Sequence, residues 1–145
     1  MSQIETARLQ DLVASLVEAA RRAGADAADA VAVRSRSADV TVRLGKVEGT
    51  EAAESDDIAL RVFIGRRVAS VSAAAGANVD ELASRAVAMA KVSPEDPVQG
   101  LADKDRLARA IRDLDLFDGT EIDAARMRED ALAMEDAARA VAGVT

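Results

Sequence analysis

The sequence predicts an α+β domain in which an antiparallel sheet of four or five strands has helices packed on one face, in the order helix, sheet, helices. Three observations support this fold class. Apolar residues recur at steps of three and four near the amino terminus, the period changes to two between residues 30 and 75, and the helical period returns after residue 78. Because the strands are clustered and joined by short connections, they are expected to pair antiparallel.

The first predicted element is a helix that ends at Gly24. At its start, Ser2 and Glu5 have the spacing of a capping box, in which each side chain accepts a hydrogen bond from an exposed backbone N–H. Arg21 and Arg22 lie in the last turn, where the helix dipole favours cations, and glycine readily takes the positive φ that ends a helix. The apolar stripe consists of Leu9, Leu12, Val13, Leu16, Val17 and Ala20.

Strands are predicted where apolar and polar residues alternate. These segments are residues 31–34, 40–44, 58–64 and 68–72, and the acidic segment 47–54 is a further candidate strand at an edge. Gly65-Arg66 indicates a type II′ hairpin turn, because glycine supplies the positive φ that this turn requires. Ser37-Ala38 and Gly45-Lys46 are the other two predicted turns.

A second amphipathic helix follows the strands. Asn78 and Glu81 have the spacing of a helix start, and the helix is expected to end near Ser93, because Pro94 disfavours helical geometry in the residue before it. Its apolar positions are Val79, Leu82, Ala83, Ala86, Val87 and Ala90.

Two further helices are predicted, a short one over residues 107–114 and a last one over residues 123–142. Along the last helix an apolar side is formed by Met127, Ala131, Met134, Ala138 and Val141. A helical stripe that contains methionine is more often core than interaction surface, so this side is expected to be buried.

The composition excludes several functions. The formal net charge of -7 opposes non-specific nucleic-acid binding, and the absence of cysteine and histidine removes a thiol nucleophile, the commonest general base and the commonest zinc ligand. The amino terminus lacks the features of a signal peptide, and no segment has the apolar length to cross a membrane. We therefore expect a cytoplasmic protein with no catalytic residue, metal site or cofactor in this chain.

The remaining polar groups offer weak alternatives to this expectation. Ser70 and Ser72 lie on a predicted strand without a histidine to activate them. The carboxylates of Asp56-Asp57 and of the Glu48, Glu51 and Glu54 group could act in acid–base catalysis, but that role requires burial, and they lie in the most polar part of the chain. A solvated acidic edge that prevents unwanted strand pairing is the favoured interpretation.

Arg61, Arg66 and Arg67 form a cluster of cations at the predicted Gly65-Arg66 hairpin. Guanidinium groups bind carboxylates through paired hydrogen bonds, so these residues are candidate contacts for a protein partner or an acidic ligand. The alternative is that an exposed turn collects charge for solubility.

Four segments follow one another along the chain: AARRAGADAADAVAVRSRSADVTVRLGKVEGTE (19–51), IALRVFIGRRVASVS (58–72), SPEDPVQGLAD (93–103) and LDLFD (114–118). In this order they resemble the amino-terminal region of PmbA/TldE proteins, in the TldD/PmbA family of "modulator of DNA gyrase" proteins. The sequence departs from the family after the hairpin, where SVSAAAGANVD (70–80) replaces the usual Ser-Thr-Ser-Asp, and at Phe117, where the family has tyrosine.

The resemblance implies that residues 1–145 form an amino-terminal domain, that the reading frame continues past Thr145, and that a metallopeptidase-like carboxy-terminal domain lies outside this chain. It implies a non-catalytic subunit that contributes to assembly and peptide-substrate handling in a TldD/TldE-type metalloprotease. The implied heterodimer partner is a TldD-like subunit, which would carry zinc through a His-Glu…His motif. The peptide substrate would be reached through the full complex, and homo-oligomer formation stays open.

Two other functions stay open. One is a stand-alone protein-binding module, such as a gyrase-related regulator, that uses the arginine-rich hairpin. The other is direct DNA binding, which the acidic charge balance disfavours.

Overall fold

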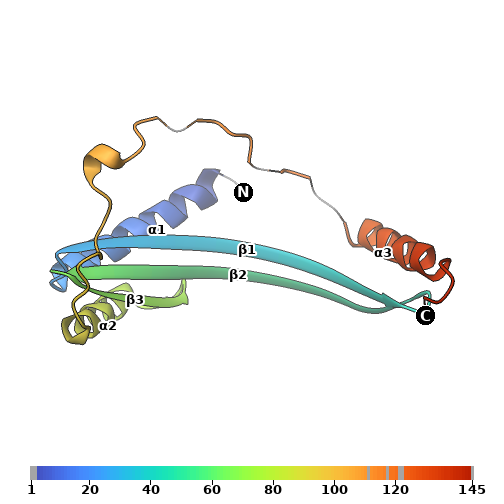
Figure 1. Cartoon of the computed structure of the whole chain (residues 1–145), viewed down its shortest axis with the longest axis horizontal. Coiled ribbons are helices and arrows are strands. Elements are labelled where there is room, and N and C mark those ends of the chain that lie inside the picture. The colour runs from blue at the N-terminus through green and yellow to red at the C-terminus, as the bar shows by residue number, and fades with distance from the viewer. Residues whose placement is uncertain (1–2, 111, 117, 121–122, 145) are drawn as a thin grey trace. The chain divides into compact units, whose positions relative to one another are not determined.

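The computed structural model describes residues 3–110, 112–116, 118–120 and 123–144 (Figure 1). The elements follow in the order α1 (Gln3–Arg22), β1 (Ala27–Arg43), β2 (Lys46–Ile64), β3 (Arg67–Ala74), α2 (Val79–Val92), a 3-10 helix (Lys104–Arg106) and α3 (Ala124–Arg139). The strands form an antiparallel sheet in the order β1-β2-β3. The α+β class is therefore confirmed. No helix in the described ranges is long and apolar enough to span a membrane.

The prediction of four or five strands is wrong, because the described sheet has three. β1 continues through Ser37-Ala38, where the sequence predicts a turn, and β2 joins residues 47–54 and 58–64 into one strand of 19 residues. A tight hairpin turn needs positive φ at a central residue, and neither Ser37 nor Ala38 has it. Without a residue suited to a reversal, the alternating pattern continues as one long strand.

Both hairpin turns contain a glycine at positive φ. Gly65 has φ +57° in the turn between β2 and β3, as the sequence predicts for Gly65-Arg66. The other turn has Leu44 and Gly45 at its centre, with φ of +52° and +73°, so it lies one residue earlier than the predicted Gly45-Lys46. Positive φ at both central residues is the signature of a type I′ turn.

The chain divides into two compact units, which are described separately. The core unit comprises residues 1–34 and 55–109, and the ribbon unit comprises residues 35–54 and 110–145.

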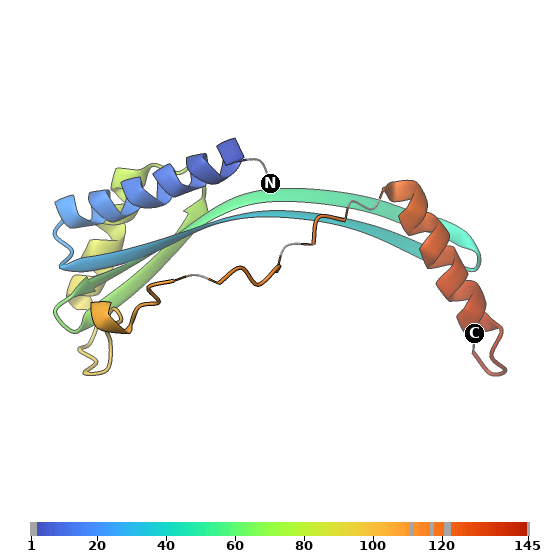
Figure 2. The same cartoon turned by 90° about the horizontal axis from the view of Figure 1, so that it is seen from above.

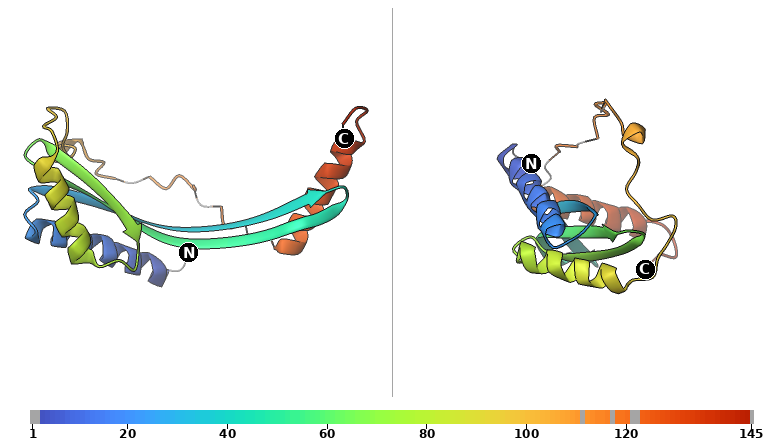
Figure 3. Two further views of the ribbon diagram at one scale, coloured as in Figure 1. Left: turned by 90° about the horizontal axis from the view of Figure 1, so that it is seen from below. Right: turned by 90° about the vertical axis from the view of Figure 1, so that its left-hand side faces the viewer.

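The core unit buries one face of its sheet against α1 and α2. Ile58, Leu60 and Val62 alternate along β2 and are almost completely buried, and β3 pairs with this part of β2 from Asp57↔Ala74 to Ile64↔Arg67. Helix α2 packs on α1 and on β3 (Figure 2 and Figure 3). The buried helix residues of this cluster are Leu16, Ala19 and Ala20 from α1, and Leu82, Ala83, Ala86, Val87 and Ala90 from α2. Alanine permits this close approach of the helices.

The ends of α1 and α2 follow the predicted signals. Gly24, just after α1, has φ +103°, and the Asn78 side chain caps α2 by accepting hydrogen bonds from the N–H groups of Asp80 and Glu81 at 3.0 and 3.2 Å. Helix α2 ends at Val92, just before the predicted limit. The predicted capping box at the start of α1 depends on Ser2 and the Glu5 side chain, which lie outside the described residues.

The ribbon unit contains the distal parts of β1 and β2, the hairpin turn between them, and α3. The predicted helix over 107–114 is wrong: the described residues there are irregular, and only the 3-10 turn precedes them. Ile111, in its predicted stripe, lies outside the described residues. A helix this short needs tertiary packing to be stable, and Leu107 and Leu114 are exposed instead.

The prediction that α3 buries an apolar side is also wrong. No described residue of α3 is buried, and Met134 and Val141 are 73% and 59% exposed. The half-buried side is formed by Met127, Ala131, Leu132 and Glu135. A two-stranded ribbon offers too little apolar surface to bury a whole helix face.

Candidate interaction surface

The three arginines predicted as partner contacts have different environments. Arg61 lies on the face of the core-unit sheet that α1 and α2 do not cover, which we call the open face. Its guanidinium forms a bidentate ion pair with Asp29 and lies 5.2 Å from the centroid of the Phe63 ring. The hydrogen bond with Asp29 raises the pKa of Arg61 above its ordinary value.

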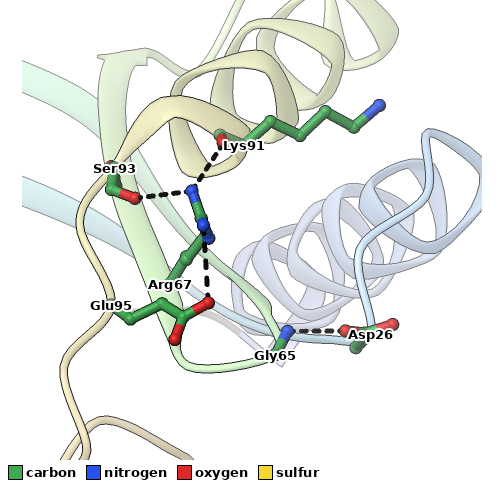
Figure 4. A network of polar contacts seen from close by, with 6 residues as sticks. All are labelled: Asp26, Gly65, Arg67, Lys91, Ser93 and Glu95. Atoms are coloured by element: carbon green, nitrogen blue, oxygen red, sulfur yellow. Dashed lines mark hydrogen bonds and ion pairs between the residues drawn. The ribbon is translucent and has the colours of Figure 1, made fainter.

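Arg67 connects the start of β3 to the end of α2 (Figure 4). Its Nη1 donates hydrogen bonds to the carbonyl oxygens of Lys91 and Ser93, each at 3.1 Å, and its Nη2 lies 3.4 Å from Oε1 of Glu95. A cation at the carboxyl end of a helix satisfies unpaired carbonyls and complements the helix dipole. Arg67 is therefore a structural contact within the core unit.

Arg66 is the one arginine of the three whose guanidinium has no interaction in the described part of the chain. It is exposed in the turn, and its carbonyl oxygen accepts a hydrogen bond from the N–H of Asp96 at 2.9 Å. The N–H of Gly65 donates to Oδ2 of Asp26 at 2.7 Å, which connects the same turn to the start of β1 (Figure 4). The turn is thus held from two sides, and Arg66 projects from a fixed backbone.

The open face of the core-unit sheet carries exposed apolar side chains. The alternating pattern in the sequence predicts a strand there, but it does not show which side of the strand the helices cover. In β1 the small residues Ala28, Ala30 and Ala32 belong to the helix-covered cluster. Val31 and Val33 are therefore on the opposite face, and they are 57% and 47% exposed. Beside the Asp29–Arg61 pair, a shallow cavity of about 280 Å³ is lined by residues that include Val31, Ala59 and Ser70.

A second concave surface lies along the amino-terminal half of α1. This groove of about 390 Å³ is lined by Thr6, Leu9, Gln10, Val13 and Ala14 from α1 and by Ala32 from β1. Sequence reasoning missed it, because Leu9 and Val13 belong to the same apolar stripe as the buried Leu16. The stripe does not reveal where along the helix the packing ends.

Three acidic residues of β2 form ion pairs with arginines of β1. Asp56 accepts hydrogen bonds from Arg34 at 2.6 and 2.5 Å. In the ribbon unit, Glu54 pairs with Arg36 at 3.1 Å and Glu48 lies 4.0 Å from Arg43. Opposite charges on neighbouring strands stabilise their pairing. The two pairs of the ribbon unit are exposed, whereas Arg34 and Asp56 are half-buried.

No catalytic arrangement is evident around the candidate serines and acids. Ser70 and Ser72 are exposed, and Glu51 and Asp57 are exposed on β2. The described residues contain no group of three acidic, histidine or cysteine side chains that could hold a metal ion. The candidate features of this surface are Arg66, the open sheet face and the groove beside α1.

Comparisons with known proteins agree with the fold. Residues 28–90 match the family model described as PmbA/TldA metallopeptidase domain 1. The chain is 34% identical over 132 residues, or 90% of its length, to a "Metalloprotease PmbA homolog" from Haemophilus influenzae. That match covers 29% of the Haemophilus protein.

Two crystal structures share the fold. A protein from Bacteroides thetaiotaomicron, named for modulation of DNA gyrase, superposes over 94% of this chain and 31% of its own, with a TM-score of 0.74 and 20% identity. TldE from Thermococcus kodakarensis superposes over 59% of this chain and 20% of its own, with a TM-score of 0.54 and 18% identity. This chain therefore spans less than a third of the length of each of these relatives.

Proposed function

This chain belongs to the PmbA/TldD family, as an amino-terminal domain of the PmbA/TldE type, and we propose that it is a non-catalytic part of a metalloprotease assembly. The observation that carries the proposal is the 34% identity, over nine-tenths of this chain, to a protein named a metalloprotease PmbA homolog. The absence of histidine and cysteine supports a non-catalytic role, because the usual ligands of a catalytic zinc are missing from these residues.

In this proposal the domain contributes to assembly with a TldD-like subunit in the cytoplasm, and that partner supplies the zinc and its ligands. The exposed valines of the open sheet face and the apolar groove beside α1 support an assembly role, because both are surfaces that a partner could cover. Peptide substrates would reach the catalytic centre through the assembled complex rather than through this domain alone.

Co-expression of the native gene product with the TldD-type protein of the same organism tests the proposal. We expect the two proteins to co-purify and to cleave an unfolded peptide in a chelator-sensitive manner. We expect residues 1–145 alone to show no peptidase activity and to bind zinc no more tightly than an ordinary acidic surface. Chelator-sensitive cleavage by residues 1–145 alone, or failure of the two full-length proteins to associate, would contradict the proposal.

A stand-alone protein-binding module is the alternative function. The observation that favours it is the guanidinium of Arg66, which has no partner among the described residues. In that case Arg66→Ala would abolish capture of a protein partner such as gyrase by the isolated chain. Retained capture after this substitution would remove the alternative.

A further inference from the structure

The turn between β1 and β2 exposes two backbone N–H groups that the strand ladder does not use. In a two-residue hairpin turn, the carbonyl before the turn bonds to the N–H after it, and the N–H groups of the two central residues need another acceptor. Here the central residues are Leu44 and Gly45, both at positive φ and both exposed.

The carboxylate of Glu135 on α3 accepts hydrogen bonds from both of these N–H groups. Its Oε1 lies 2.5 Å from the nitrogen of Leu44, and its Oε2 lies 2.8 Å from the nitrogen of Gly45. Each N–H thus donates to a different oxygen of the carboxylate. Two parallel donors bind a planar anion with this geometry. Hydrogen bonds to an ionised acceptor are stronger than neutral ones.

Leu44 is an unfavourable residue for this turn. Positive φ costs a branched L-residue about 1–2 kcal/mol, and asparagine or glycine is the usual residue at the first centre of a type I′ turn. The Leu44 side chain is 64% exposed, so burial does not offset this cost. Unfavourable backbone conformations persist where the surrounding structure holds them, and they cluster at ligand-binding and switch sites.

Helix α3 is loosely held apart from this contact. None of its described residues is buried, and its contact side is only half-buried. The Glu135 carboxylate is therefore attached to an element that can leave the turn at low cost, because little apolar surface becomes exposed when it does.

We propose that the Leu44-Gly45 turn is a carboxylate-binding site, and that Glu135 is its internal, displaceable ligand. The carboxylate that replaces Glu135 comes either from an acidic side chain or from the free carboxyl terminus of a peptide. The site does not depend on the proposed metalloprotease role, because it concerns binding by this chain alone.

Amide NMR signals of Leu44 and Gly45 in the 145-residue chain test the proposal. In Glu135→Gln, both amide protons should move upfield and exchange with solvent about tenfold faster, as expected when a charge-assisted hydrogen bond worth about 1.4 kcal/mol is lost. The matched control is Glu129→Gln, which removes an exposed carboxylate from the same helix and should leave both signals unchanged. Circular dichroism checks that each variant is folded.

Ligand addition to Glu135→Gln then separates the two sources of carboxylate. A short peptide with a free carboxyl terminus should return both amide signals toward their wild-type positions, whereas its amidated form should not. An amidated peptide with an internal glutamate carries only a side-chain carboxylate, so recovery of the signals with this peptide would identify an acidic side chain as the ligand. Unchanged signals in Glu135→Gln would refute Glu135 as the ligand. If the signals change in Glu135→Gln but none of these peptides restores them, Glu135 is not a displaceable ligand, and its only role is to attach α3 to the turn.

Discussion

The two hairpin turns of this protein use the same hydrogen-bonding device in different surroundings. At the β2–β3 turn, the N–H of Gly65 donates to Asp26, which directly precedes β1 in the core unit. At the β1–β2 turn, the N–H groups of Leu44 and Gly45 donate to Glu135, which lies about 90 residues along the chain on a helix without buried residues. A carboxylate anchored by a packed core is a fixed part of the fold, whereas one on an unburied helix is exchangeable.

The core and ribbon units also differ in how much of their structure is packed in a buried core. The buried residues of the described chain all lie in the core unit, where burial of apolar surface provides the main stabilisation. The ribbon unit depends on strand hydrogen bonds, cross-strand ion pairs and the Glu135 contact. We therefore expect substitutions in the core unit to change global stability and those in the ribbon unit to act locally.

The largest expected effect separates the two units directly. Leu60→Ala removes a fully buried side chain from the core unit and should lower the free energy of unfolding by about 2–5 kcal/mol. Leu132→Ala is the matched change on the half-buried side of α3 and should cost at most about 1 kcal/mol. Urea denaturation of both variants measures the difference. Equal losses of unfolding free energy in the two variants would show that the ribbon unit and the core unit unfold together.

An intermediate effect is expected at the arginines of the β2–β3 turn. Arg67→Ala removes hydrogen bonds to Lys91, Ser93 and Glu95 and should cost about 1–2 kcal/mol, whereas Arg66→Ala should change stability by less than about 0.5 kcal/mol. Thermal denaturation compares the two variants. Similar losses for both would contradict the structural role assigned to Arg67.

The smallest expected effect is a gain in the ribbon unit. Leu44→Asn places a residue that tolerates positive φ in the type I′ turn and should stabilise the turn by about 0.5–1 kcal/mol. Slower amide exchange at residues next to the turn, with unchanged urea denaturation of the core unit, is the predicted result. A change in global stability would show that the two units unfold together.

The local signals in the sequence predicted the core unit well. Gly24, Asn78 and Gly65 act through backbone conformation or capping of their own segments, so their roles follow from neighbouring residues alone. The four segments that resemble PmbA/TldE proteins are likewise local in sequence, and the comparisons confirm the family that they indicate. The fused strands were mispredicted because the polar Ser37 was read as a sign of a turn, although neither Ser37 nor Ala38 adopts the positive φ that a tight hairpin turn needs.

The candidate interaction surfaces could not be predicted from local sequence, because they depend on residues that are distant in the chain. The arginine cluster around Arg66 is one group in sequence, yet Arg61 and Arg67 have partners on different elements. The valines of β1 alternate as a strand requires, but the face on which they lie depends on α1 and α2. The contact between Glu135 and the Leu44-Gly45 turn has no sequence signal, because it joins a helix to a distant hairpin.

Composition and local sequence were sufficient to predict the α+β class, the family, the turn at Gly65 and the start and end of α2, and they give the absence of imidazole and thiolate groups from this chain. These properties depend on composition or on interactions within a few residues. The tertiary structure decided the strand number, the exposure of α3 and the partners of Arg61, Arg67 and Glu135. The physical reason is that burial and charge pairing depend on which surfaces meet, and residues far apart in the chain create those surfaces.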